Sequence, residues 1–222
     1  VEAIRSIWSS WQEGSKLDFR GEFYTHTLMT PFFNPGPNPF GIPKIYVAAV
    51  GPLMTKAVGE SADGLLVHPF HTPKYMQETT LPIVEEALSS ISKKRSEFDF
   101  SISVMTATGT NEESYEKAVT ACRNGISFYA STPAYKGVLE AHGYGGLQGK
   151  LNLLSKEGKW QEMGTLIDDE LLNSVAVVAE SPEKVAEEIQ KRYKGKGARI
   201  SPAFYSGEIE LASQVIQELR KG

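Results

Sequence analysis

The stretch Ile45-Tyr46-Val47-Ala48-Ala49-Val50-Gly51-Pro52 indicates the fold class most directly. Its first six residues are apolar or aromatic, and a short unbroken run of this kind is typical of a parallel strand that is covered on both faces. Gly51 ends the run, and Pro52 suits the first position of a helix, which we expect to extend to about Ser61. The stretch therefore predicts one strand–turn–helix unit.

The same alternation of strand and helix recurs towards the C-terminus. Further strands are predicted at 65–67, 100–107 and 198–201, the last extending at most to 205, and helices at 74–92, 112–129, 182–193 and 208–220. Between the third and fourth strands, residues 133–172 predict several short helices separated by glycines. Alternating strands and helices imply a parallel sheet in an α/β fold, and four such units make half of a (β/α)8 barrel.

The segment ahead of the first unit has a different character. Apolar residues at Ile4, Ile7, Trp8 and Trp11 predict an amphipathic helix that ends near Gly14. Residues 17–24 alternate and predict one side of a hairpin, and five prolines between 31 and 43 break regular structure. Because the chain opens inside a helix without a methionine, we expect it to lack preceding residues. We treat residues 1–222 as one N-terminally incomplete domain.

Composition and charge exclude several classes of protein. The chain has 222 residues and a net charge of -4, and its longest basic run is Lys93-Lys94-Arg95, so no nucleic-acid partner is expected. No apolar run reaches the length of a membrane span, and no signal peptide is recognisable. A single cysteine, Cys122, excludes a disulfide framework and suits a buried apolar position. These features predict a cytoplasmic protein without a membrane partner.

Four groups of residues are candidates for a site at the carboxyl ends of the strands, where parallel barrels carry their functional groups. The turn within 48–54 leads into a helix N-terminus, which suits phosphate, although a plain turn with proline at the first helical position explains it equally. The other groups are 68–73, whose histidines permit proton transfer or hydrogen bonding in a loop, 105–108 and 129–135. His68 and His71 leave a metal-dependent hydrolase open as an alternative, although no metal site is predicted.

The ordered set of these segments resembles the luciferase-like monooxygenase superfamily, and most closely its coenzyme F420-dependent oxidoreductase branch. The segments that carry the resemblance are 43–52, Gly59-Glu60-Ser61-Ala62-Asp63-Gly64, His68-Pro69-Phe70, 127–135, Trp160, Ile167-Asp168-Asp169-Glu170 and Ser181-Pro182-Glu183-Lys184-Val185. The resemblance spans nearly the whole chain.

The resemblance implies the C-terminal half of a (β/α)8 TIM barrel, strands five to eight, with the helical insertion between the third and fourth strands of this chain. It implies coenzyme F420 or FMN as cofactor, with hydride transfer between cofactor and a small organic substrate as the reaction. The residues it implies at the cofactor are Ala49, Val50, Gly51, Pro52, His68 and Pro69. Those expected at the substrate are Phe70, His71, Thr106 and Tyr129, and no catalytic acid or base is assigned.

Two further alternatives stay open beside this reading. The first is an FMN-dependent monooxygenase of the same fold. The second is a non-catalytic half-barrel that pairs through its open sheet edges, since exposed parallel edges favour association. The expected partners are accordingly a small-molecule substrate and either a second copy of the chain or an N-terminal half-barrel.

Overall fold

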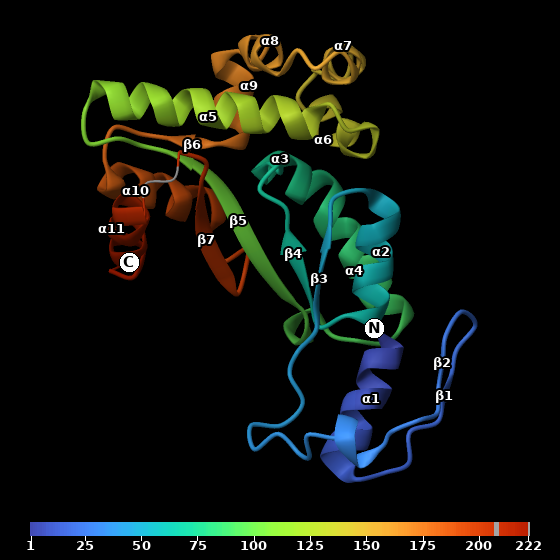
Figure 1. Ribbon diagram of the computed structural model, residues 1–222. Coiled ribbons are helices and arrows are strands. Elements are labelled where there is room, and N and C mark those ends of the chain that lie inside the picture. Colours follow the sequence, from blue (N-terminus) through green and yellow to red (C-terminus); the bar gives the residue numbers. More distant parts are fainter. Residues whose placement is uncertain (207–208, 222) are drawn as a thin grey trace.

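The computed structural model describes residues 1–206 and 209–221. Its centre is a sheet of five parallel strands, shown in Figure 1. The strands are β3 (Tyr46–Ala49), β4 (Gly64–Val67), β5 (Asp99–Ala107), β6 (Val177–Val178) and β7 (Arg199–Phe204). Four of them confirm the predicted strands within one or two residues. The two-residue β6 was not predicted, because so short a segment carries no periodic signal.

The register fixes the order of the strands. Ile102 of β5 pairs with Val67 on one edge and with Ile200 on the other, so β4 and β7 flank β5. Thr106 pairs with Val177 as well as with β7, which places β6 beyond β4 on the same edge of β5. The long strands therefore lie in chain order, β3-β4-β5-β7. The described residues form an open sheet, without closure into a barrel.

One face of the sheet is covered by helices and the other is largely open. Alternate residues of β5, namely Phe100, Ile102 and Val104, are each at most 1% exposed and belong to a core with α2 (Pro52–Ser61), α4 (Leu81–Ser90), α10 (Pro182–Tyr193) and α11 (Ile209–Leu219). On the opposite face, Ala48 and Leu66 are exposed. Side chains alternate along a strand, so burial on one face only produces this pattern.

The helix expected at 74–92 is interrupted by a wider turn. Helix α3 (Pro73–Tyr75) passes through a π-helical turn, Met76–Thr80, into α4. The N–H of Leu81 donates to the carbonyl of Met76, five residues back. Pro82 explains the interruption, because proline has no N–H to donate and its ring crowds the carbonyl one turn earlier.

The predicted insertion is helical and lies beyond the carboxyl ends of the strands, at the top of Figure 1. It follows the long helix α5 (Glu112–Ala130) and begins with a 3-10 turn, Pro133–Tyr135. The remaining helices are α6 (Lys136–Glu140), α7 (Leu147–Lys156), α8 (Trp160–Thr165) and α9 (Asp169–Val175). The Asp168 side chain caps α9 by accepting from the N–H of Leu171 at 2.8 Å.

The N-terminal segment lies at the opposite end of the sheet (Figure 1). Helix α1 (Glu2–Glu13) ends at Gly14, whose φ of 68° is the left-handed conformation that glycine adopts at little cost. The expected hairpin is present as β1 (Phe19–Arg20) and β2 (Thr25–His26), and a 3-10 turn follows at Pro31–Phe33.

Cys122 is fully buried within α5, as predicted. The predicted start of the last helix at Glu208 lies outside the described residues, and α11 is described from Ile209. Across the described residues, none of the helices combines the length and apolar character that crossing a membrane requires.

Candidate functional site

The turn from β3 into α2 presents backbone N–H groups at the carboxyl edge of the sheet. Gly51 is the N-cap of α2 and has no side chain to satisfy the first turn. The N–H and the hydroxyl of Thr55 both donate to the Gly51 carbonyl at 3.0 Å, which closes the helix behind the turn. The N–H groups of Leu53 and Met54 have no intrahelical acceptor and lie at the positive end of the helix dipole.

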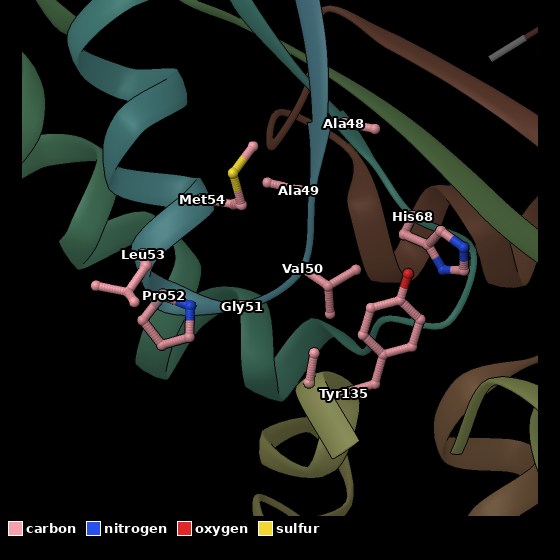
Figure 2. Close-up of a pocket in the computed structure, with 10 residues that line it drawn as sticks. Ala48, Ala49, Val50, Gly51, Pro52, Leu53, Met54, His68 and Tyr135 are labelled. Carbon is pink, nitrogen blue, oxygen red and sulfur yellow. The ribbon is translucent and has the colours of Figure 1, made fainter. Parts of the chain in front are cut away.

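A cavity of about 430 Å³ opens at this turn. Figure 2 shows the turn on one side and the rings of His68 and Tyr135 on the other. Among the described residues, the lining includes no Asp, Glu, Lys or Arg side chain. It consists of Ala48, Ala49, Val50, Gly51, Pro52, Leu53, Met54, His68, Ala134 and Tyr135. The wall is mostly apolar, with backbone N–H groups, one imidazole and one phenol as its polar atoms.

His68 follows β4 directly and is held by its own loop. The N–H of Phe70 donates to Nδ1 of His68 at 3.0 Å, so Nδ1 is an acceptor and the proton of the neutral ring resides on Nε2. Burial lowers the pKa of His68 below its ordinary value of 6.5. At neutral pH the ring is therefore an uncharged donor through Nε2.

Aromatic rings from α5 and from the start of the insertion pack against His68. The Tyr129 ring stands edge-on to the imidazole with centroids 4.6 Å apart, and the Tyr135 ring lies at 5.3 Å. The hydroxyl of Tyr205 donates to the hydroxyl oxygen of Tyr129 at 3.3 Å. Burial raises the pKa of Tyr205, so this donor stays protonated. The proton of the Tyr129 hydroxyl is left to donate elsewhere.

The structure places the ten predicted site residues in two groups. Five of the six expected at the cofactor line the cavity, and the sixth, Pro69, adjoins His68 without lining it. Of the four expected at the substrate, Tyr129 is half-buried beside His68, whereas Phe70, His71 and Thr106 are at most 3% exposed and lie in the interior. Thr106 lies on the same face of β5 as Ile102 and Val104, because side chains alternate along a strand.

His71 is a core residue in this arrangement. Its Nε2 lies 3.0 Å from the hydroxyl of Thr80, in the π-helical turn. Burial, with a smaller contribution from His68, lowers its pKa to about 4, so the ring is neutral. Across 1–206 and 209–221, His, Cys, Asp and Glu side chains form no group of three that could hold a metal ion.

Five further residues line the cavity but were not among the ten predicted: Ala48, Leu53, Met54, Ala134 and Tyr135. All five fall within the candidate stretches 48–54 and 129–135 of the sequence. Proximity in the chain to Gly51 indicated the first three. The approach of Ala134 and Tyr135 to the turn depends on how the insertion folds back, which periodicity does not reveal.

The amino-terminal end of the sheet carries a separate charged cluster. Asp99 accepts from the Tyr46 hydroxyl at 2.5 Å and from Nζ of Lys44 at 2.9 Å, which lowers the pKa of its carboxyl group. The Arg199 guanidinium lies 5.4 Å from the Tyr46 ring centroid. In parallel α/β folds this end of the strands contributes to stability.

The sequence model of the family described as luciferase-like monooxygenase matches residues 1–199. The uncharacterized protein Rv1360 of Mycobacterium tuberculosis is 44% identical over 221 residues, which cover 100% of this chain and 65% of that protein. An F420-dependent glucose-6-phosphate dehydrogenase of Nakamurella multipartita is 26% identical over 114 residues, or 51% of this chain and 31% of the relative.

A solved structure has the same fold. The coenzyme F420-dependent tetrahydromethanopterin reductase of Methanopyrus kandleri superposes with a TM-score of 0.73 at 19% sequence identity, over 98% of this chain and 62% of that one. The chain thus spans 65% of the length of Rv1360 and 62% of the length of the reductase, less than two thirds in both cases.

Proposed function

The chain belongs to the luciferase-like monooxygenase family, and we propose that it forms the cofactor-phosphate side of an F420-dependent oxidoreductase. One observation carries the proposal: an uncharged cavity at the carboxyl edge of a parallel sheet is bounded by an uncapped helix N-terminus at Gly51. Such an end binds phosphate through free N–H groups and the helix dipole.

The donor set fits a flavin or deazaflavin phosphate. The N–H groups of Leu53 and Met54 supply directed donors, and His68 and the Tyr135 hydroxyl supply neutral ones across the cavity. The apolar wall suits an uncharged stem between phosphate and ring. Relatives with F420-dependent activities favour the deazaflavin over FMN.

We propose that β3, β4, β5 and β7 occupy the places of strands five to eight in a (β/α)8 barrel. The chain-order arrangement of these strands and their shared helical face support this assignment. The outer edges of β3 and β7 would then pair with further strands, from an N-terminal half-barrel or from a second copy.

In this assignment the cofactor supplies hydride transfer to or from a small organic substrate. The residues of this chain would bind and orient it: the Gly51 turn would hold the phosphate end, and His68 and the Tyr135 hydroxyl would supply hydrogen-bond donors. The aromatic rings at Tyr129 and Tyr205 exclude water from this side of the site.

Fluorescence titration with F420 and FMN tests the proposal, on the 222-residue chain and on the complete gene product that carries it. We expect the complete product to bind F420 more tightly than FMN. Saturable binding of neither cofactor by the complete product would refute the proposal. Tighter binding of FMN would favour the monooxygenase alternative, whose support is the family itself.

A non-catalytic module that associates through the exposed edges of β3 and β7 remains the second candidate. Light scattering distinguishes it. A defined oligomer of the chain that binds neither cofactor would support this candidate, and a folded monomer would contradict it.

A further inference from the structure

A buried tyrosine holds the backbone of the candidate phosphate turn. The hydroxyl of Tyr75, in α3, donates to the carbonyl oxygen of Val50 at 3.2 Å. Tyr75 is 4% exposed, and burial raises the pKa of its hydroxyl. The hydroxyl therefore stays protonated and donates within the interior of the protein. The Val50 carbonyl therefore points inward, to α3.

The direction of this carbonyl sets the direction of the next N–H. The chain contains no cis peptide bond among the described residues, and in a planar trans peptide the C=O and the following N–H point in opposite directions. Because the Val50 carbonyl faces Tyr75, the N–H of Gly51 faces away from it. Val50 and Gly51 both line the cavity, so the turn meets the cavity at the peptide group that Tyr75 orients.

The loop and the insertion hold Tyr75 in place from several sides. The Thr72 hydroxyl accepts from the N–H of Tyr75 at 3.0 Å, and lies 2.9 Å from Nε2 of His142, which follows α6. The His71 ring packs edge-on against the phenol with centroids 5.4 Å apart. A methyl group added at Gly137 of α6 would lie 3.3 Å from the Tyr75 hydroxyl oxygen.

We propose that Tyr75 is a positioning residue that aims the Gly51 N–H at the cofactor phosphate, and that the helical insertion acts on the phosphate turn through Tyr75. The proposal rests on the function proposed above. It assigns no chemistry to Tyr75, which touches neither the cavity nor the turn's N–H groups.

Two variants with matched controls test it. Tyr75→Phe removes the hydroxyl and keeps the ring, and Tyr144→Phe removes a comparable hydroxyl that donates to Asp168 in the insertion, away from the turn. Gly137→Ala places a methyl group 3.3 Å from the Tyr75 hydroxyl oxygen. Gly149→Ala adds a methyl group in α7 with no neighbouring atom within 4 Å.

The first readout needs no cofactor. In the 222-residue chain labelled with 15N-glycine, we expect the Gly51 amide resonance to move in Tyr75→Phe and in Gly137→Ala and to stay in place in both controls. An unmoved Gly51 resonance in Tyr75→Phe would overturn the proposal, whatever the chain binds.

The second readout is the dissociation constant of F420 for the complete gene product, measured below the onset of unfolding. Loss of one hydrogen bond predicts roughly threefold to tenfold weaker binding for Tyr75→Phe and unchanged binding for Tyr144→Phe. If the unaltered protein bound no F420, the proposed function would fail, and the amide measurement would still decide the orientation of Gly51. Equal affinity of Tyr75→Phe and the unaltered protein would overturn the positioning role.

Discussion

The backbone N–H of Phe70 donates to Nδ1 of His68 at 3.0 Å, and so assigns the ring proton of His68 to Nε2. This hydrogen bond spans only two residues, yet it determines what the imidazole offers to the cavity. A loop that binds its own histidine in this way provides a donor whose orientation is set before any ligand arrives.

The tautomer of His68 predicts how cofactor binding depends on pH. Because burial lowers the pKa of His68 below its ordinary value of 6.5, the neutral Nε2–H donor predominates from pH 8 down to 6.5. We expect the F420 dissociation constant to be flat over that range. His68→Phe keeps a ring against Tyr129 and should weaken binding about threefold to tenfold. A tenfold change in affinity between pH 8 and 6.5 in the unaltered protein, absent from His68→Phe, would contradict the assignment.

His71 predicts a loss of stability in acid. Its pKa is about 4 in the folded chain and near 6.5 when unfolded, so the unfolded state binds more protons between these values. The free energy of unfolding should therefore decrease as pH falls from 6.5 to 4, and this residue contributes up to about 3 kcal/mol to the loss. His71→Gln should flatten the pH dependence of denaturant unfolding, and His26→Gln in β2 serves as control. Equal slopes for His71→Gln and the unaltered chain would argue against the buried neutral ring.

Replacing Gly59 with alanine is expected to create a packing defect between α2 and α4. A methyl group at this position would lie 2.6 Å from Cβ of Ala87, closer than two carbons can approach. Gly59→Ala should destabilise the chain by about 1–2 kcal/mol, since overpacking exceeds the gain in helix propensity. Gly149→Ala, which meets no neighbour, should stabilise it by up to about 1 kcal/mol. Chemical unfolding measures the stability of both variants. An increase in stability for Gly59→Ala would show that α2 and α4 move apart at little energetic cost.

The cluster at the amino-terminal end of the sheet predicts an effect on stability alone. Asp99→Asn removes the charge that Lys44 and the Tyr46 hydroxyl share. We expect the thermal midpoint to fall by about 1–3 °C, because partly exposed ion pairs contribute little. The F420 affinity should not change, since this cluster and the Gly51 turn lie at opposite ends of β3. Weaker binding by Asp99→Asn would mean that the two ends are coupled.

Much of the fold was predictable because its signals are local. Ser181-Pro182 marked the start of α10, and the Ser181 side chain indeed caps that helix by accepting from the N–H of Lys184. The apolar run before Gly51 marked β3 in the same way. The π-helical turn at Met76–Thr80 and the short β6 were not predictable in this way, because a proline within a helix does not specify how the neighbouring turns adjust and two residues show no period.

The candidate site, too, was predictable only where its signals are local. The turn at Gly51 and the adjacent His68 followed from their place after buried strands, since parallel strands end at one edge of the sheet. Phe70, His71 and Thr106 were expected at the substrate, yet they are buried here, because a residue's place in the sequence does not state which way its side chain turns.

By itself, therefore, the sequence determined where strands, turns and helices occur and which edge of the sheet carries the candidate site, because propensity, capping and periodicity act over a few neighbouring residues. Only the tertiary structure decided that Tyr135 returns to face His68 and that Tyr75 holds the carbonyl of Val50. These contacts join segments that are 67 and 25 residues apart in the chain. They depend on how whole helices pack on the sheet, which short-range preferences do not specify.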